Sequence, residues 1–364
     1  MNTDNSSMDM APALAKELFS KGAILVVAGV PITTEFGIDL CTYTVGDRFR
    51  GIKMIPPGPH YVYCAAQSPY GDYAPRVGFL HNFKPFEILV REWDPDTEEL
   101  RPRNISDPET EKKRIRENLR DLDRFLGAYD YRFIQKWRNL TDSITEEGID
   151  RCSPECGVVR TNIELMSCPD SERPRGCLSS NTNIVTRGLV DEDDLLPNLK
   201  PIPGTAPNFT DLPSKVPTEA SPSEISKHYL DCIDAVDKIM EKFSMSIDLI
   251  EEIQIAFVMF LVGHSVEALA HWRKLLNLLS NSEEAVLKHQ LFYMKYLDVL
   301  QYQLPHMPEE LLEQNDKNTV YKDVRTLILN CFIGGLSVNA DKLMKSLNKN
   351  MQWKFPNLLD EDPE

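Results

Sequence analysis

Residues 34–60 read TEFGIDLCTYTVGDRFRGIKMIPPGPH, and this stretch decides the fold class of the first half of the chain. Its short apolar runs are separated by four glycines, three prolines and three acidic residues. Such spacing is typical of short strands joined by turns. Similar strand-like runs are found at residues 23–28, 36–43, 61–64, 76–83 and 86–93. Because no helical stretch alternates with these runs, the sequence predicts an antiparallel β-sandwich-like domain rather than a parallel βαβ sheet.

Helical periodicity begins after the last of these strands. Four apolar residues between Ile115 and Leu126 recur at helical spacing, which predicts an amphipathic helix with Gly127 as its C-terminal cap. A second helix is predicted over residues 133–144. We expect these two helices to flank and close the first domain.

The second half of the chain predicts an all-α domain. Residues 221–224, Ser-Pro-Ser-Glu, have the pattern of a capping box with proline at the first helical position. Residues 249–262 are apolar nearly all round, which predicts a central buried helix. Further helices are predicted over residues 225–239, 266–279, 283–303 and 320–348. Gly334 and Gly335 are expected to break the last of these. The fold class is therefore α+β with two domains.

The predicted organisation has four parts. They are a β-rich domain at 12–149, a linker at 150–215, a helical domain at 216–350 and a tail at 351–364. Eight prolines and a run of four acidic residues interrupt every candidate element of the linker, so we expect it to be flexible.

The charge balance limits the partners. The formal net charge is −16, from 56 acidic against 40 basic residues, which disfavours direct binding to nucleic acid. It favours solubility and a basic protein surface as partner. The apolar runs are too short to span a membrane, and nothing in the sequence requires a dimer. Eight cysteines in a chain of 364 residues do not make a disulfide framework.

Chemical motifs are sparse. The sequence has none of the common phosphate-binding loops and neither a G-x-S-x-G nor an H-E-x-x-H motif. His264, Glu267 and His271 would share one face of a helix and could ligate Zn²⁺ or Fe²⁺. Their alternative is a polar flank beside Trp272. The sequence therefore predicts no catalytic residue, no cofactor and no metal, with a metal-dependent hydrolase as a less favoured hypothesis.

Cysteines raise two further questions. The first concerns Cys152, Cys156, Cys168 and Cys177. These four cysteines are either the ligands of a zinc ion or reduced thiols of the linker. A weaker metal or nucleophile hypothesis involves Cys41, His60 and Cys64. A nucleophilic thiol needs a low pKa and a paired base, so small buried thiols are the favoured interpretation of these cysteines.

Two segments are candidates for protein contact. The loop 55–60 is rich in glycine and proline, and its Pro56, Pro57 and Gly58 are predicted to contact a partner. The segment 352–359 holds Trp353 and Phe355, and it has the composition of an extended recognition peptide that adds a strand to a partner sheet. The alternative for this second segment is that it folds back on its own helices.

Several long motifs resemble the Aar-two (a-one/alpha-two repression) splicing factor family. In the first half they are EFGID at 35–39, FRGIKMIPPG at 49–58 and LDRFLGAY at 122–129. In the second half they are AFV at 256–258, FL at 260–261, Gly263, EA at 267–268 and HWRKLLNLL at 271–279. The resemblance covers both predicted domains in the same order.

The resemblance implies a function for the chain. It implies a non-enzymatic assembly factor, cytoplasmic and nuclear, for the U-five small nuclear ribonucleoprotein of the spliceosome. Its implied partner is the large scaffold protein of that particle, bound at RNase H-like and JAB/MPN-like domains until the particle's helicase takes its place. Two domains on a flexible linker would engage two modules at once and gain avidity. A generic helical adaptor that binds short peptides is the alternative.

Overall fold

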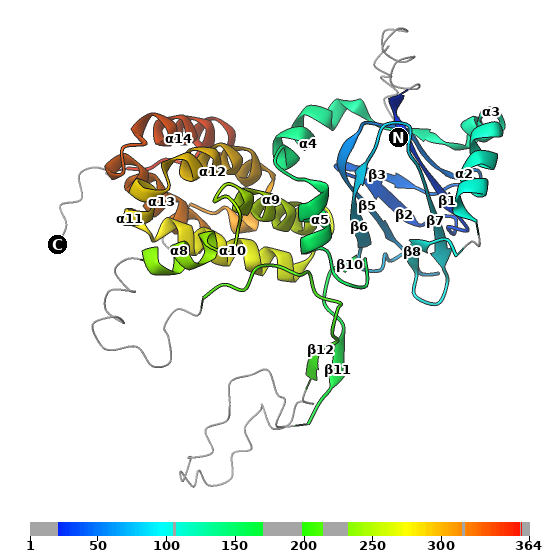
Figure 1. Ribbon diagram of the computed structural model, residues 1–364, viewed down its shortest axis with the longest axis horizontal. Helices are drawn as coiled ribbons and strands as arrows, with labels where there is room; N and C mark the ends of the chain where they lie inside the picture. The colour runs from blue at the N-terminus through cyan, green and yellow to red at the C-terminus, as the bar shows by residue number, and fades with distance from the viewer. Residues whose placement is uncertain are drawn as a thin grey trace.

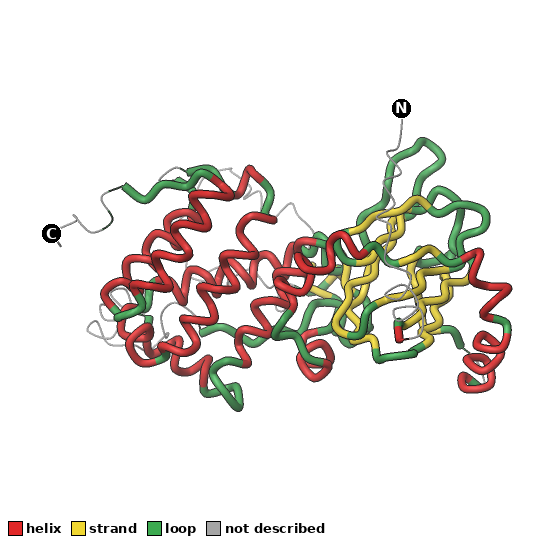
Figure 2. Tube along the Cα trace, turned by 90° about the horizontal axis from the view of Figure 1, so that it is seen from above, coloured by secondary structure: helices red, strands yellow, loops and turns green. Residues whose placement is uncertain are grey.

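The computed structural model describes residues 21–104, 107–169, 199–213, 232–314, 317–356 and 358. A part rich in strands is followed by a helical part, and the two lie side by side (Figures 1 and 2). The predicted α+β fold class is therefore confirmed. The capping box at 221–224 and Cys177 lie outside the described residues.

Two five-stranded sheets form the first part. One has the order β8-β7-β1-β4-β9 and the other β10-β6-β5-β2-β3. The strands are β1 Ala23–Ala28, β2 Glu35–Ile38, β3 Cys41–Thr44, β4 Gly51–Ile55, β5 Gly58–Ala65, β6 Val77–Phe83, β7 Ile88–Asp94, β8 Glu99–Pro102, β9 Gly127–Ala128 and β10 Val159–Arg160. Leu25 and Ile52 of one sheet and Phe36 and Val62 of the other belong to one buried cluster, so the sheets enclose a common core.

Most strand pairs are antiparallel, as predicted, and two pairs are parallel. β1 lies parallel to β7, and β4 lies parallel to β9. The first of these pairs is not a βαβ unit, because the chain between β1 and β7 forms the strands β2 to β6. Parallel pairing therefore arises here from a long excursion through both sheets rather than from a crossover helix.

Two local predictions in this part were wrong. The run 36–43 is a hairpin rather than one strand, because the chain turns at Asp39, whose φ is +55°, and Ile38 pairs with Cys41. Gly127 does not cap a long helix. The helices α2 Pro108–Glu117 and α3 Leu119–Leu122 end before it, and Gly127 pairs with Ile52 of β4 instead. The edge of β4 that faces away from β1 offers backbone hydrogen bonds to Gly127, and helical spacing alone does not predict such a pairing.

The helices are named here by their bounds. They are α4 Ile134–Thr141, α5 Glu146–Cys152, α8 Ile233–Met240, α9 Asp248–Leu261, α10 Val266–Ser280, α11 Glu283–Lys288, α12 Gln290–Gln303, α13 Thr319–Ile333 and α14 Ser337–Met351. The predicted helix 283–303 is divided at His289, and the predicted break at the glycine pair is confirmed. Gly335 has a φ of +83°, which an L side chain adopts only with strain.

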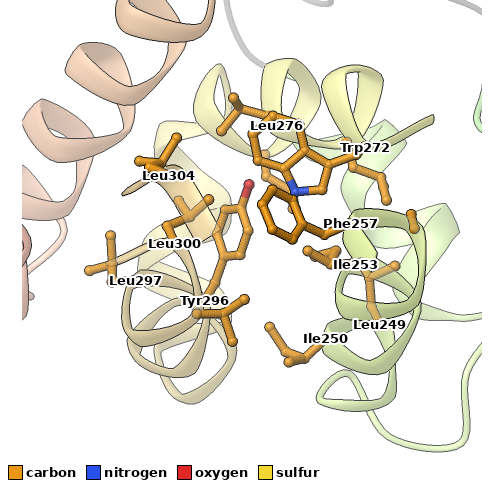
Figure 3. Close-up of a cluster of buried hydrophobic side chains, with 14 of the residues drawn as sticks. Leu249, Ile250, Ile253, Phe257, Trp272, Leu276, Tyr296, Leu297, Leu300 and Leu304 are labelled. Carbon is orange, nitrogen blue, oxygen red and sulfur yellow. The ribbon is translucent and has the colours of Figure 1, made fainter. Parts of the chain in front are cut away.

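The second core surrounds α9, as the apolar run predicts. Eleven of its fourteen residues are buried. Phe257 of α9 packs against Trp272 of α10, with 5.7 Å between their ring centroids, and Tyr296 of α12 lies in the same cluster (Figure 3). The indole N–H of Trp272 donates a hydrogen bond to Gln303 at 2.9 Å, so this ring carries no unsatisfied polar atom. Among the described residues, no helix combines the length and the apolar character that crossing a membrane requires.

The segment predicted as a linker contains local structure in its described residues. A two-stranded ribbon pairs β11 Leu165–Ser167 with β12 Leu199–Pro201. The ribbon extends away from both cores (Figure 1). Phe209 and Leu212, farther along, pack against the helical core. The exact domain boundaries stay predictions.

Candidate functional site at the junction of the two domains

The two parts of the chain share a hydrophobic core at their junction. Tyr61 of β5, Trp137 of α4 and Phe257 of α9 belong to a single cluster of buried side chains. The helices α4 and α5 lie between the sheets and the helices α8 to α14 (Figure 1). This geometry gives one preformed body, so it replaces the avidity argument from freely tethered domains with one from preorganisation.

The predicted loop 55–60 is shorter in the structure, because β4 ends at Ile55 and β5 begins at Gly58, so only Pro56 and Pro57 connect the two strands. A buried hydrogen-bond network fixes this segment, which keeps the name loop 55–60. The carboxylate of Asp39 lies 2.6 Å from Nδ1 of His60 and accepts a hydrogen bond from the hydroxyl of Tyr129 at 2.6 Å. The other ring nitrogen of His60 lies 2.8 Å from the carbonyl oxygen of Pro56. The indole N–H of Trp137 donates to the carbonyl oxygen of Pro59 at 2.8 Å. The loop is therefore held from inside at both ends.

This network decides which loop residues a partner could reach. Pro56 is buried, Gly58 is half-buried and Pro57 is exposed. A partner would meet Pro57 first, on a loop whose backbone is already ordered. Contact through this loop stays a prediction. His60 is committed to Asp39 and Pro56 rather than to a cysteine or a metal.

A second contact joins sheet and helices at the α9–α10 turn. The guanidinium of Arg76 donates to Glu35 at 3.0 Å and to the carbonyl oxygen of Val262 at 3.0 Å, and it lies over the ring of Tyr63. A methyl group at Gly263 would lie 2.1 Å from the buried hydroxyl of Tyr61, so only glycine allows this approach. The turn is thus fitted closely to the outer face of the second sheet.

A third contact centres on Glu252 of α9, whose side chain is fully buried. His271 of α10 lies 2.8 Å from this carboxylate, and Arg151 of α5 donates to it at 2.5 Å. The backbone N–H and the hydroxyl of Thr210 each donate at 2.9 Å. The ring of Phe209 stacks on His271, with 4.5 Å between centroids. One carboxylate therefore ties together the β-rich part, the helical part and the segment that enters the helical part.

The charge of Glu252 is stabilised by these partners. Burial alone would raise its pKa, but hydrogen bonds from His271 and Thr210 outweigh burial and lower the pKa below its ordinary value of 4.5. The neighbouring Glu251 accepts from the backbone N–H of Thr145 at 2.7 Å. The junction is thus built on buried carboxylates with hydrogen-bond donors already in place.

The proposed metal-binding triad is not assembled. His271 faces Glu252 and Phe209 instead of Glu267. His264 lies in the α9–α10 turn with a φ of +57°, and burial together with nearby Arg76 lowers its pKa. In the ranges that the structure describes, no three His, Cys, Asp or Glu side chains are grouped to hold a metal ion. The three side chains named by the hydrolase hypothesis are therefore not assembled into a ligand set.

The cysteines that the structure describes do not form a site either. Cys41, Cys64, Cys152 and Cys331 are buried, and burial raises the pKa of each thiol to about 12. A thiol with so high a pKa is neither a nucleophile nor a ready metal ligand at neutral pH. Exposed Cys156 donates its S–H to the carbonyl oxygen of Val158.

Alkylation of the native chain is expected to separate these classes. Iodoacetamide at about pH 8 should modify Cys156 and leave Cys41, Cys64, Cys152 and Cys331 unmodified, because the thiolate is the reacting form. Peptide mass spectrometry reads the sites, and the same reaction in denaturant, where all of them should react, is the control. Fast modification of Cys41 or Cys64 in the native chain would reopen the nucleophile hypothesis.

The aromatic residues after α14 fold back on the helices. Trp353 is 2% exposed and donates its indole N–H to the carbonyl oxygen of Leu312 at 2.9 Å. The ring of Phe355 stacks on Tyr321, with 5.7 Å between centroids. Of the two alternatives for this segment, the structure has the second, because Trp353 finds both an apolar pocket and an acceptor on its own bundle. A role in partner binding would require this segment to detach.

Sequence reasoning missed Glu252, Arg151 and Thr210 as a unit. One signal was present, since Glu251 and Glu252 are adjacent acids in a helix that is otherwise mostly apolar. Buried charges are rare unless they are paired, so the pair predicts buried cationic or hydrogen-bonding partners. Their identity depends on residues about 40 and 100 positions away.

Comparisons with known proteins give matches in both parts. A family model described as AAR2 N-terminal domain matches residues 21–154, and one described as AAR2 C-terminal repeat region matches residues 209–356. The chain is 33% identical to the "Protein AAR2 homolog" of Mus musculus and to that of Homo sapiens, over 96% of this chain and 94% of each relative. It is 31% identical to the "Protein AAR2 homolog" of Caenorhabditis elegans, over 83% of this chain and 84% of that protein.

Proposed function

The chain belongs to the AAR2 family of splicing-related assembly factors, which are not catalysts, and from this premise we propose that it binds the large scaffold protein of the U-five small nuclear ribonucleoprotein. It engages the RNase H-like and JAB/MPN-like domains of that protein during particle biogenesis. In this role it is a chaperone that keeps the helicase and RNA from engaging the scaffold too early. It acts as a monomer in the cytoplasm and accompanies the scaffold towards the nucleus.

The observation that carries this proposal is the extent of the family match. Relatives align with 96% of the chain, across both parts and the junction between them. The junction residues join the two parts into one body, which suits a protein that must hold two domains of a partner in a fixed arrangement. Preorganisation of this kind lowers the entropic cost of binding.

The charge of the chain supports a basic partner surface. A net charge of −16 gives an electrostatic field that attracts positive protein surfaces and repels RNA. Surfaces that bind RNA are themselves basic. Occupying such a surface on the scaffold would keep RNA away without any chemical step.

One feature favours the alternative of a helical peptide-binding adaptor. Exposed apolar side chains gather at one end of the helical part, on α11 to α14: Leu287, Leu291, Met294, Ile333 and Val338. Gln290 of α12 donates to the carbonyl oxygen of Gly334 at 3.2 Å, and Lys342 of α14 donates to Asp298 of α12 at 2.7 Å. These two contacts place α12 and α14 side by side at this end. A peptide adaptor would use this surface alone.

A binding assay tests the proposal against this alternative. Purified chain is mixed with the scaffold's RNase H-like domain, its JAB/MPN-like domain and a fragment holding both, and complexes are isolated by size-exclusion chromatography. We expect a one-to-one complex at micromolar concentration, tightest with the two-domain fragment. Failure to bind any of the three would contradict the proposed function. The adaptor would be favoured if the double variant Leu291→Lys with Val338→Lys no longer bound the scaffold and if binding needed no residue of the β-rich part.

A further inference from the structure

A cavity of about 470 Å³ opens at one end of the β-sandwich, away from the loop 55–60 and from the junction network of Glu252. Three segments enclose it: the β5–β6 connection, the β7–β8 hairpin and the chain that follows β10. Its volume lies within the roughly 300–1,000 Å³ typical of ligand pockets. Its wall is charged, through Arg76, Asp96, Glu98, Glu99, Arg160 and Glu164.

The charges of this cavity do not balance. Four carboxylates face two guanidinium groups, which leaves a net charge of −2. Arg76 is occupied by Glu35, Val262 and the ring of Tyr63. Arg160 is occupied on one side by Glu99 and on the other by Glu164, at 3.1 Å. Both internal cations are therefore already engaged.

Two carboxylates of the wall have no cation of their own. Asp96 and Glu98 are exposed at the tip of the β7–β8 hairpin, and no ion pair is formed by either with a residue that the structure describes. The hairpin is ordered, since the backbone N–H of Asp96 donates to the carboxylate of Asp94 at 3.0 Å. The backbone that carries Asp96 is thus ordered before any ligand arrives.

Exposed aromatic rings lie on the connection that supplies part of the cavity wall, although the rings themselves do not line the cavity. Tyr70 is 94% exposed and Tyr73 is 47% exposed, both on the β5–β6 connection that also supplies Ala74, Pro75 and Arg76 to the cavity. This connection is folded rather than loose, because Ser68 donates its backbone N–H to Asp72 at 2.8 Å and Gln67 pairs with Tyr73. Exposed tyrosines on an ordered connection are typical of protein interfaces.

We propose that this cavity receives an arginine side chain of the protein partner, with Asp96 and Glu98 as its carboxylate acceptors. Charge complementarity selects a cation. Arginine fits better than lysine because its planar guanidinium pairs with two carboxylates at once. The inference rests on the proposed function, since it names where the basic surface of the scaffold would anchor on the β-rich part.

The test compares two double variants of equal charge change. Asp96→Asn with Glu98→Gln alters the cavity, and Glu309→Gln with Glu310→Gln removes two exposed carboxylates from the helical part. Affinity for the two-domain scaffold fragment is measured by calorimetry at low and at physiological salt. We expect the cavity variant to bind about 10-fold or more weakly and the control to stay within about 2-fold of wild type. Equal losses in both variants, or none in either, would overturn the proposal while leaving the function intact.

A second readout does not depend on the scaffold. Nα-acetyl-arginine methylamide is titrated into the isotopically labelled full chain, with the glutamine analogue as neutral control, and backbone amide signals are followed by NMR. Saturable shifts at residues 96–99 and 160–164 in wild type, and their loss in the cavity variant, are expected. Absence of shifts at about 10 mM ligand would overturn the cavity proposal even if the scaffold binds elsewhere. Failure of wild type to bind the scaffold, with these shifts present, would instead contradict the proposed function alone.

Discussion

Replacing Glu252 with alanine is expected to lower the free energy of unfolding by about 3–5 kcal/mol. The carboxylate is fully buried and is bound by Arg151, His271 and Thr210. Removing it leaves the backbone N–H of Thr210 without its acceptor at the junction of the two parts and takes from Arg151 one of its two carboxylate partners, the other being Glu251 at 3.4 Å. Chemical denaturation at neutral pH measures the loss. A change below about 1 kcal/mol would show that the junction does not depend on this carboxylate.

The pH dependence of the stability loss in Glu252→Ala serves as a control for the role of the charge. Because the pKa of Glu252 is lowered in the folded chain, its charge stabilises the fold above its ordinary pKa of 4.5. That contribution is lost as pH falls through the folded pKa. The difference in stability between wild type and Glu252→Ala should therefore be largest near neutral pH and shrink below 4.5. Glu252→Gln, which keeps the shape but not the charge, should lie between the two.

Replacing Trp137 with alanine is expected to cost about 3–5 kcal/mol, the range for deleting a buried aromatic ring. Trp137 is 1% exposed, lies in the core shared by both parts and donates to the carbonyl oxygen of Pro59. The variant removes the ring and leaves that carbonyl without its donor. Denaturation monitored by circular dichroism gives the loss in stability.

Trp137→Phe is the matched control for this substitution. It keeps most of the apolar contact and removes the indole N–H, so it should cost about 0.5–1.5 kcal/mol for the lost hydrogen bond, plus a smaller packing loss. The alanine variant should also speed hydrogen exchange in the loop 55–60, which the indole holds. Equal stability of the two variants would contradict a structural role for the ring itself.

Local patterns predicted the elements whose signal is contained in neighbouring residues. The strand Ala23–Ala28 and the central helix α9 follow from unbroken apolar runs, and the division between α13 and α14 follows from Gly334 and Gly335. The strands β4 and β9 were missed because each is defined by a partner far along the chain. Gly127, for example, pairs with Ile52. Register of this kind is a tertiary property, and helix-cap preferences near Gly127 point elsewhere.

The site was harder to predict than the fold. The sequence shows Trp353 but not the acceptor at Leu312 that decides between a free and a folded segment. It shows the acids at 251 and 252 but not that Arg151 and Thr210 meet them. Two domains with a proline-rich segment between them suggest loose tethering, and the shared core is visible only once both parts are in place. The sequence thus suggests two separate domains, while the structure has one hydrophobic core shared by both parts at their junction.

Hydrogen–deuterium exchange of the full chain, free and bound to the two-domain scaffold fragment, tests the central proposal most directly. A single body that holds both scaffold domains should gain protection in both of its parts within one complex. We expect slower exchange in the β-rich part, including residues 94–99, and in the helical part at the same saturating concentration. Protection confined to one part, or no protection at all, would contradict the account.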